Sequence, residues 1–449
     1  MPPTLALFLA WCLIGWLLRT EFRFRKLRSK ALWVPAILIS VQGSRPVSEW
    51  LGSVGQNRLA GDPVNTLTFA VLIGVSLIVL RRRNFNWNLV VNENKALFLI
   101  YAYLAASALW SDVPLVSLKR LLKDYACVLA ALVFLTEQDP ASAVRAVYVR
   151  VAYILFPLSL VYGKYFPSIG RNYSQEGEPM FTGVTTQKNS LGELVFILAL
   201  FLVWDLVETW RDTSRKKLQR AVRVLIIFLG LWLLIASDSK TSIFCLIVGV
   251  AIFWAAGRLL RMKHGKQLLI SSLAVIICLA ALDETFGLSQ MIIRALGRNP
   301  TLTGRTEIWR VLLDQHTNPL VGEGFYIFWD TEKGNNAANA LARINTAHNG
   351  YLEMYLDGGI IGIALLVFLL LNAGKRAIGR LFNHQQFGKM ALIFWALAII
   401  YNWSESSFFR LDLLWFTFLL VTINYPLKRS AARRHEVQVG ASIREPQWA

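Results

Sequence analysis

The feature that most constrains the fold of this chain is the alternation of apolar runs with short charged connectors. Such runs, each about 15 to 20 residues long, recur along the whole chain, and ~20 apolar residues suffice to cross a bilayer as a helix. Only 17% of the residues are charged, against roughly a quarter in soluble domains. The pattern predicts an all-α polytopic membrane protein and excludes a disordered chain or a small secreted disulfide scaffold.

We expect about 13 transmembrane helices and one large extracytoplasmic loop that contains short helices. The expected spans lie near residues 4–18, 31–49, 64–80, 96–110, 116–135, 143–162, 189–204, 222–236, 242–257, 268–286, 350–372, 390–402 and 413–425. The second span is interrupted by Arg45-Pro46, because proline breaks a helix. The chain then divides into N-terminal transmembrane helices (1–95), a transmembrane core (96–286), the long loop (287–349), C-terminal transmembrane helices (350–425) and a basic tail (426–449).

The positive charge of the chain predicts its orientation in the membrane. The net charge of +19 comes from 47 Lys and Arg against 28 Asp and Glu. Most of these basic residues fall in alternate connectors, at 19–30, 81–94, 205–221, 258–267, 373–389 and the tail, which contains Lys428, Arg429, Arg433 and Arg434. Basic connectors face the cytoplasm. The N-terminus and the 287–349 loop are therefore expected outside, and the charge reflects topology and anionic lipids rather than nucleic acid.

The cysteines do not indicate a metal site or a disulfide framework. Cys12, Cys127, Cys245 and Cys278 all lie inside apolar runs. A thiol in such a run behaves as a small hydrophobic side chain. We expect no metal and no cofactor.

Unusual polar residues gather at the extracytoplasmic ends of the expected spans. They are Lys188-Asn189, Lys240, the 287–349 loop and the stretch from Glu405 to Arg410. Ionisable groups close to a membrane indicate a functional site. In a transporter or flippase such groups would line a path at mid-membrane depth, so their restriction to one face argues against that class of protein.

Lys240 and Arg305 are the candidate anion-binding residues of this face. Lys240 lies in a very short connector and is expected either to reach a shared polar cleft or to anchor the interface by snorkelling. The apolar spacing of residues 302–313 predicts an amphipathic helix with Thr303 as its N-cap. Arg305 would then lie in the first turn, where unpaired backbone N–H groups favour a phosphate. The alternative is an ion pair between Arg305 and a carboxylate of the same loop, Glu307 or Asp314.

His348 is the candidate proton acceptor. It opens the sequence His348-Asn-Gly-Tyr-Leu-Glu353, which leads directly into an expected span. An imidazole titrates near neutral pH, so it can act as a general base or, when protonated, bind a phosphate. The alternative is that His348 or Asn349 merely caps the helix. Glu307 and Glu353 are the reserve candidates for acid or base.

The chain resembles the O-antigen ligase/polymerase superfamily of polytopic bacterial membrane proteins, in particular exopolysaccharide polymerases of the ExoQ kind. The resemblance covers roughly residues 95–425. It rests on Trp110-Ser-Asp-Val-Pro-Leu-Val-Ser-Leu-Lys-Arg120, Phe181-Thr-Gly-Val-Thr-Thr-Gln-Lys-Asn189, Ser237-Asp-Ser-Lys-Thr-Ser242, Thr301-Leu-Thr-Gly-Arg-Thr-Glu-Ile-Trp309 and His348-Asn-Gly-Tyr-Leu-Glu353, followed by Gly359 and Gly362. Each fragment is short, but their order along the chain is specific.

The resemblance implies a metal-independent glycosyltransferase of the bacterial inner membrane. Its substrate would be an oligosaccharide linked to undecaprenyl diphosphate, and the 287–349 loop would be its catalytic loop. By resemblance, Arg305 and Lys240 would bind the diphosphate and His348 would be a functional residue. From the residues themselves we also expect Lys188 to bind the diphosphate, His348 and Arg305 to be catalytic, and Asn349, Glu307 or Glu353 to assist as acceptor, acid or base. A chain-length regulator or export complex is an expected partner besides the lipid bilayer.

Three functions remain open at this stage. A polymerase would transfer glycan to a second lipid-linked repeat unit, whereas an O-antigen ligase would transfer it to lipid A-core. The two signatures Thr182-Gly-Val-Thr-Thr-Gln-Lys-Asn189 and Ser239-Lys-Thr-Ser242 favour the polymerase. A polysaccharide lipid transporter or flippase is the further alternative.

Overall fold

The structure is a computed structural model that describes residues 1–25, 29–52, 61–173, 177–210, 217–273, 305–341, 344–385 and 387–425. Nearly every regular element in these ranges is a helix. The strands β1 (Arg171–Tyr173) and β2 (Pro179–Phe181) form one short antiparallel hairpin. The predicted all-α polytopic membrane fold is therefore confirmed.

Seven of the described helices are long and apolar enough to cross a membrane, and each coincides with a predicted span. They are α1 (Pro3–Phe24), α4 (Pro63–Arg82), α8 (Pro140–Tyr165), α10 (Lys188–Thr209), α11 (Lys217–Ala236), α12 (Lys240–Leu259) and α17 (Gly350–Phe382). The shorter apolar helices are α2 (Trp33–Gln42, preceded by η1, Lys30–Leu32), α6 (Lys95–Ala106, followed by η2, Ser107–Leu109), α18 (Gly388–Tyr401) and α19 (Leu413–Thr422). The predicted span 116–135 corresponds to α7 (Pro114–Leu135).

Two of the predicted spans differ from the structure or extend beyond it. The helix expected over 31–49 ends at Gln42, and the chain turns at Arg45-Pro46 before the single-turn α3 (Val47–Trp50). The Arg45 N–H donates to Val184 O at 2.9 Å instead of continuing the helix. The span expected over 268–286 lies mostly outside the described residues, although residues 265–273 are helical.

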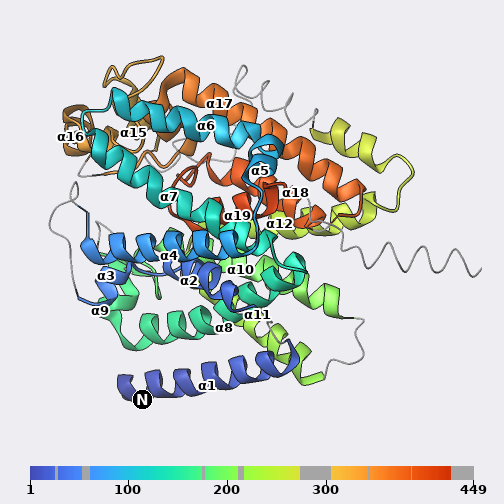
Figure 1. The fold of residues 1–449 in the computed structure, drawn as a ribbon. Coiled ribbons are helices and arrows are strands. Elements are labelled where there is room, and N and C mark those ends of the chain that lie inside the picture. The colour runs from blue at the N-terminus through green and yellow to red at the C-terminus, as the bar shows by residue number, and fades with distance from the viewer. Residues whose placement is uncertain are drawn as a thin grey trace, which may run out of the picture.

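The remaining elements are short and lie in the connectors. They are α5 (Trp87–Glu93), α9 (Pro167–Gly170), α15 (Arg305–Leu313), η3 (Phe328–Asp330) and α16 (Glu332–Ala340). In Figure 1, α3, α9, α15 and α16 gather at the left end of the long helices, on the side where the N-terminus lies. Thr303 and residues 287–304 of the predicted loop, as well as the tail at 426–449, lie outside the described residues.

Several connectors meet at this end of the bundle, which we call the loop face. It consists of the described residues of 43–52, 107–113, 182–189, 237–240, 305–349 and 402–412. These connectors are joined by hydrogen bonds, for example from Trp110 Nε1 to Val321 O at 3.2 Å and from the Gly350 N–H to Asn402 O at 2.8 Å. The helices α7, α10, α12, α17 and α19 all begin at these connectors, so their N-termini point toward one surface.

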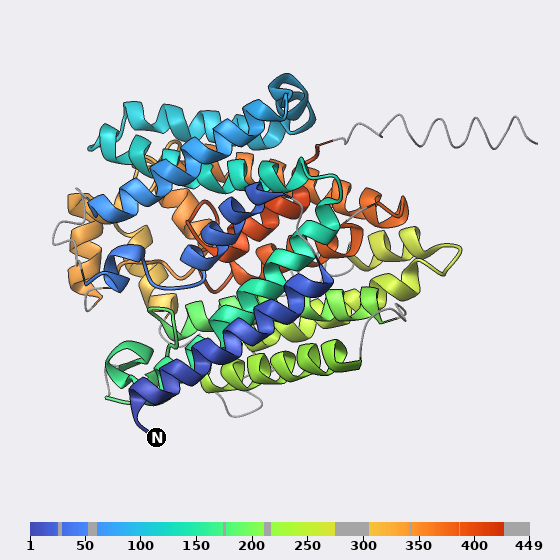
Figure 2. The ribbon, with the colours of Figure 1, turned by 60° about the horizontal axis from the view of Figure 1, so that its bottom comes forward.

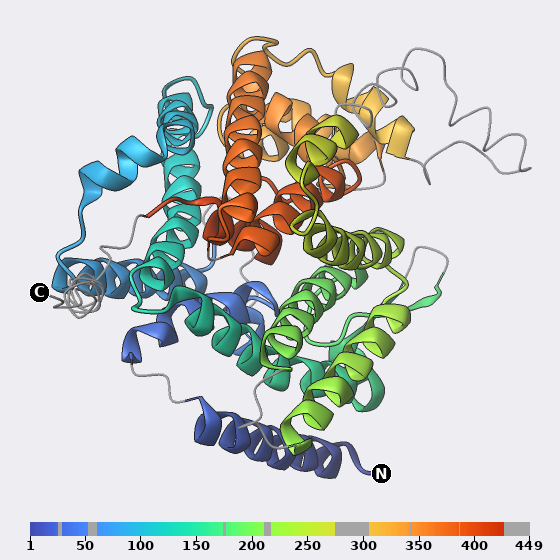
Figure 3. The same ribbon diagram turned by 90° about the vertical axis from the view of Figure 1, so that its right-hand side faces the viewer.

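A buried ion cluster joins the first helix to the rest of the bundle at the opposite end. Arg223 of α11 lies between two carboxylates, with Nη2 2.8 Å from Glu21 Oε2 of α1 and Nε 2.6 Å from Asp205 Oδ2 of α10. Arg25 also pairs with Asp205, at 2.6 Å. α1 otherwise lies at one edge of the bundle, far from α17 (Figures 1 and 3), and its length is visible in Figure 2. Buried charges need such partners because their desolvation is costly.

Helix α17 is broken at Gly359, and the loop before it fills the break. Gly359 has φ 61° and ψ −162°, a conformation that is essentially restricted to glycine. The backbone of residues 319–324 supplies the missing partners. The Ile360 N–H donates to Pro319 O at 2.9 Å, and Leu356 O accepts from the Glu323 N–H at 2.9 Å. In a membrane protein every such group must be satisfied internally, so the break fixes the loop against α17.

We predict that Gly359→Ala destabilises the protein by about 3 kcal/mol, because it combines a glycine-only backbone conformation with a steric clash. A Cβ at this position would lie 2.3 Å from the Leu320 carbonyl carbon. Gly379→Ala, in the same helix with nothing within 4 Å of the added Cβ, is the matched control. In thermal unfolding of the purified proteins in detergent, the unfolding temperature of Gly359→Ala should lie several degrees below that of Gly379→Ala. Equal unfolding temperatures would contradict the packing of the loop on α17.

Candidate functional site

Glu405 is the meeting point of three polar side chains on the loop face. Its Oε1 atom accepts a hydrogen bond from Arg305 Nη2 at 2.9 Å and another from Asn189 Nδ2 at 2.8 Å. Its Oε2 atom lies 3.3 Å from His348 Nδ1. Arg305 also donates to the backbone carbonyl of Ser404. The structure thus brings together Arg305 and His348, which the sequence analysis proposed separately.

The position of His348 is set by the close approach of α17 to the connector that carries Glu405. The Gly350 N–H donates both to Asn402 O and to Glu405 O, at 2.8 and 2.9 Å. A Cβ on Gly350 would lie 2.0 Å from Asn402 Oδ1, so only glycine permits this contact. The first turn of α17 is thereby held against the Glu405 backbone, and His348 lies just before it.

Arg305 comes from a different element, the short helix α15. The predicted amphipathic helix is present as Arg305–Leu313, and it buries Ile308 and Leu312 as its apolar spacing requires. Arg305 is its first residue. The carboxylate that pairs with Arg305 among the described residues is Glu405, which lies outside the 287–349 loop. The alternative of a pair with Glu307 or Asp314 is therefore wrong.

Lys188 and Lys240 meet at a second carboxylate, Asp238. Lys240 Nζ lies 2.6 Å from Asp238 Oδ1, and Lys188 Nζ lies 3.9 Å from Asp238 Oδ2. The hydrogen bond from Lys240, with the charge of Lys188, lowers the pKa of the Asp238 carboxyl. Lys240 is 83% exposed, so its ammonium is open to solvent rather than enclosed in a cleft.

The lysine pair is connected to Glu405 through neighbouring residues. Thr241, next to Lys240, has its hydroxyl 3.1 Å from that of Ser404, next to Glu405. Asn189, next to Lys188, donates to Glu405 itself. Lys188 and Lys240 are the first residues of α10 and α12, so their ammonium groups add to the positive ends of two helix dipoles.

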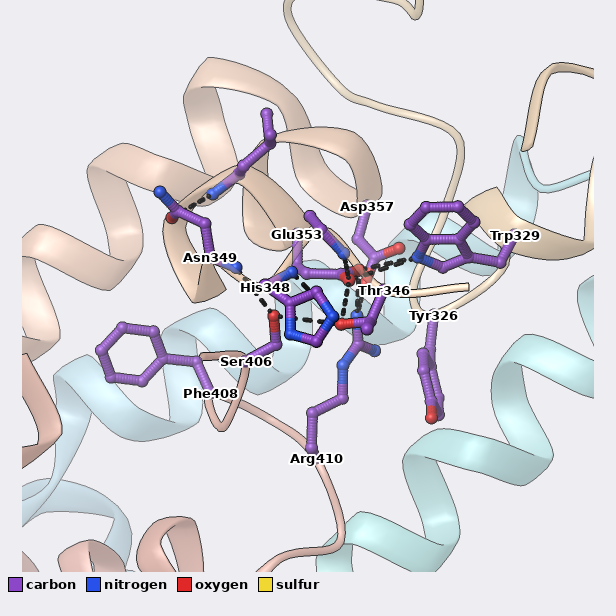
Figure 4. A network of polar contacts seen from close by, with 12 residues as sticks. Tyr326, Trp329, Thr346, His348, Asn349, Glu353, Asp357, Ser406, Phe408 and Arg410 are labelled. Carbon is purple, nitrogen blue, oxygen red and sulfur yellow. Dashed lines mark hydrogen bonds and ion pairs between the residues drawn. The ribbon is translucent and has the colours of Figure 1, made fainter. Parts of the chain in front are cut away.

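Glu353 belongs to a buried network behind His348 (Figure 4). It is 3% exposed, and its carboxylate accepts from the Ala347 N–H at 2.7 Å and from Arg410 Nη2 at 2.7 Å. Trp329 Nε1 donates to both of its oxygens. The Arg410 guanidinium in turn lies 3.7 Å from the centre of the Tyr326 ring. The network fixes the residue that precedes His348 and joins it to the rest of the loop.

The two other candidates have simpler surroundings. Asn349 is the N-cap of α17, and its Oδ1 accepts from the Tyr351 and Leu352 N–H groups at 3.0 and 3.1 Å. The capping alternative therefore holds for Asn349. Glu307 is exposed in the first turn of α15.

Glu405 is the residue that sequence reasoning did not select. The only signal was its place in a polar stretch between two apolar spans. Its partners lie 100, 57 and 216 residues away in the chain, so no local spacing indicates them.

Metal ligands are not grouped in the described part of the chain. Residues 1–425, apart from the gaps given above, contain no group of three or more His, Cys, Asp or Glu side chains that could hold a metal ion. Besides the carboxylates of Glu405 and Asp238, the site assembles a guanidinium, two ammonium groups and an imidazole. These are groups that bind anions.

The fold and site define a polytopic membrane protein with a cationic centre at one end of its helices. Residues 225–367 match the family described as O-antigen ligase. The chain is also 26% identical, over 336 residues, to the exopolysaccharide production protein ExoQ of Rhizobium meliloti (strain 1021), an alignment that covers 71% of this chain and 72% of ExoQ. Both similarities support the resemblance to the O-antigen ligase/polymerase superfamily found in the sequence, and with it a ligase- or polymerase-type function on polysaccharide.

Proposed function

We propose that the protein polymerises polyprenyl-diphosphate-linked oligosaccharide repeat units into an exopolysaccharide or O-antigen. The observation that supports this most is the convergence of Arg305 and His348 on Glu405. A cation for a departing diphosphate and a base for an attacking hydroxyl then lie on either side of one carboxylate. The similarity to ExoQ, whose name refers to exopolysaccharide production, favours polymerisation over ligation.

The loop face is proposed to be extracytoplasmic. The connectors at the opposite end of the helices carry most of the Lys and Arg residues, and such connectors stay in the cytoplasm. The N-terminus then lies outside and the basic tail inside, in the bacterial inner membrane. Substrate would reach the site from the outer leaflet, where a polyprenyl chain can remain in the bilayer while its glycan projects into the loops.

The diphosphate is proposed to bind Arg305, Lys240 and Lys188. Each of these cations is paired with a carboxylate, Glu405 or Asp238. A diphosphate carries more charge than either carboxylate and offers several acceptor oxygens, so it can take over these contacts. The N-termini of α10 and α12 favour negative charge at the same place. These groups would stabilise the charge that develops on the leaving diphosphate.

His348 is proposed as the general base. A carboxylate at Nδ1 orients the ring and leaves Nε2 to accept a proton, with Glu405 in the orienting role. The acceptor hydroxyl oxygen forms a bond to the anomeric carbon while the bond from that carbon to the diphosphate oxygen breaks. The electron pair leaves with polyprenyl diphosphate, and the hydroxyl proton passes to His348 and then to solvent. Direct attack of this kind inverts the anomeric centre. Glu353, being buried and engaged, would position His348 rather than transfer a proton.

We predict that the reaction needs no divalent metal, because Arg305 and the two lysines supply the charge that a metal would otherwise provide. Incubation of the purified protein with excess EDTA should change its turnover by less than twofold. Re-addition of Mg²⁺ or Mn²⁺ is the control and should likewise have little effect. A loss of activity in EDTA that either ion restores would contradict a metal-independent reaction.

The test of the proposed function is reconstitution with a single substrate. The protein in nanodiscs receives lipid-linked repeat units alone, and the products are separated by size. A ladder of longer lipid-linked glycans is the expected result, because no other acceptor is present. Transfer only after lipid A-core is added would instead identify an O-antigen ligase, which the match to the O-antigen ligase family makes the second candidate. Inactivity in both mixtures would return a lipid transporter to consideration.

A further inference from the structure

A cavity with several polar groups in its wall lies beside the candidate site, on the other side of the first turn of α10. Its volume is about 380 Å³. It is lined by the end of α2, the first turns of α4, the middle of α7, residues 185–194 and the start of α19. None of the residues assigned to the diphosphate or to proton transfer lines it, so it needs an explanation of its own.

The geometry of α10 places this cavity opposite the lysine pair. Successive residues of an α-helix point about 100° apart. Lys188 faces Asp238, Asn189 donates to Glu405, and Ser190 lines the cavity. Glu405 and its partners therefore lie between the two lysines on one side and the cavity on the other. A ligand in the cavity would approach the site from the side away from Lys188 and Lys240.

The polar groups of the cavity suit a hydroxyl-rich ligand. Thr186 and Ser190 are half-buried at its wall, and each hydroxyl can both donate and accept. Gln42 Oε1 is buried and accepts no hydrogen bond from the described part of the chain. Lys123 adds a donor. Both kinds of hydrogen-bonding group thus face one space.

The charges of the cavity disfavour a phosphate. Besides Lys123, its wall contains the carboxyl groups of Glu193 and Asp412. Each accepts a backbone N–H of α19, from Leu414 and Trp415 respectively, at 2.8 Å, so both are fixed in place. The lining therefore offers an anion one ammonium beside two carboxyl groups, whereas Arg305, Lys188 and Lys240 offer it three cations. Sugars carry hydroxyls that pair with donors and acceptors alike, and their apolar faces suit a neighbour such as Phe69.

We propose that this cavity binds the terminal sugar of the acceptor glycan and presents its hydroxyl to His348. The inference rests on the proposed function, since only a glycosyl transfer supplies a glycan acceptor. It adds a location and a set of residues for the second substrate. Donor and acceptor would then approach the site from opposite sides of the first turn of α10, and their reacting ends would meet beside Glu405 and His348.

The experiment measures the KM for the donor and the KM for the acceptor independently. The donor is the lipid-linked repeat unit, and the acceptor probe is the same oligosaccharide freed from its lipid and tagged with a fluorophore at its reducing end. The variant is Thr186→Val combined with Ser190→Ala, which removes two hydroxyls with little change of volume. Its KM for the tagged acceptor should rise about tenfold, the expected loss of two neutral hydrogen bonds, while its KM for the donor stays within twofold of wild type.

A second variant, Ser190→Leu, fills the cavity and should abolish transfer to the tagged acceptor. Ser272→Leu, at an exposed helical position far from the loop face in sequence and outside this cavity, is the matched control and should behave as wild type. An unchanged acceptor KM in the double variant would overturn the proposal, as would a rise confined to the donor KM. Binding of polyprenyl diphosphate that lacks a glycan reports the proposed diphosphate site separately. Suppose that wild type binds this glycan-free diphosphate and extends lipid-linked glycans, and that the cavity variants have the same acceptor kinetics as wild type. In that case only the cavity assignment fails, and the proposed function stands.

Discussion

Replacing His348 with asparagine is expected to lower kcat about 1,000-fold and to leave the KM for the lipid-linked donor nearly unchanged. General-base catalysis contributes roughly 10²- to 10⁴-fold, and an amide cannot accept the proton of the attacking hydroxyl. Asparagine is the sharper substitution because His348 has φ 48°, a left-handed conformation that asparagine tolerates. The measurement is initial-rate kinetics on protein in nanodiscs, with the amount of folded protein checked by size exclusion.

His316→Asn is the matched control, because His316 is an exposed histidine of the same loop that also has a positive φ, 49°. Its kinetics should remain those of wild type. The split between kcat and KM distinguishes the two roles of His348 that the sequence left open. A donor KM that rises while kcat is retained would show that His348 binds the phosphate, and unchanged values of both would remove it from the site.

The second large effect is expected at Arg305. Arg305→Ala should reduce kcat/KM for the donor by about 10²- to 10³-fold, the usual cost of removing one group that stabilises developing negative charge. Arg305→Lys should fall between this variant and wild type, because lysine keeps the charge but loses the forked geometry. Polyprenyl diphosphate, the leaving group, should inhibit wild type most strongly, Arg305→Lys less and Arg305→Ala least.

The control for Arg305 is Arg310→Ala. Arg310 lies in the same short helix but is exposed, and it tests whether any loss of positive charge in α15 has the same effect. Its kcat/KM should remain within about twofold of wild type. If Arg305→Ala retained full activity and full product inhibition, the diphosphate would have to bind elsewhere on the loop face.

Hydropathy alone located most of the helices. The seven long spanning helices coincide with predicted spans because a run of apolar residues long enough for the bilayer has few other solutions. The break at Arg45-Pro46 was also foreseeable, since proline cannot continue α2. The break in α17 was not. Gly359 was noted only as part of a family pattern, and nothing local shows that residues 319–324 supply its missing backbone partners.

The candidate site was predictable in its parts and not in its arrangement. Arg305 and His348 were singled out because charged residues near a membrane are costly without a role. Their joint partner, Glu405, depends on the packing of the first turn of α17 against residues 402–405, which is a tertiary contact. The same limit applies to Glu353, whose reserve role as acid or base was suggested by its place in the motif. Its burial beneath Arg410 emerges only when the loop is folded.

The buried ion cluster has a consequence for how the chain is made. Glu21 lies in the last turn of α1 and Arg25 caps that helix, yet their partners Asp205 and Arg223 follow about 180 to 200 residues later in the chain. At 5–20 residues per second, that separation corresponds to roughly 10 to 40 s of synthesis. During this interval Glu21 and Arg25 have only their own ion pair, 3.8 Å long, and lack the two partners that bury them in the folded protein. The cluster can close only once α11 is made, so we expect α1 to take up its final place after α11 rather than at the start of folding.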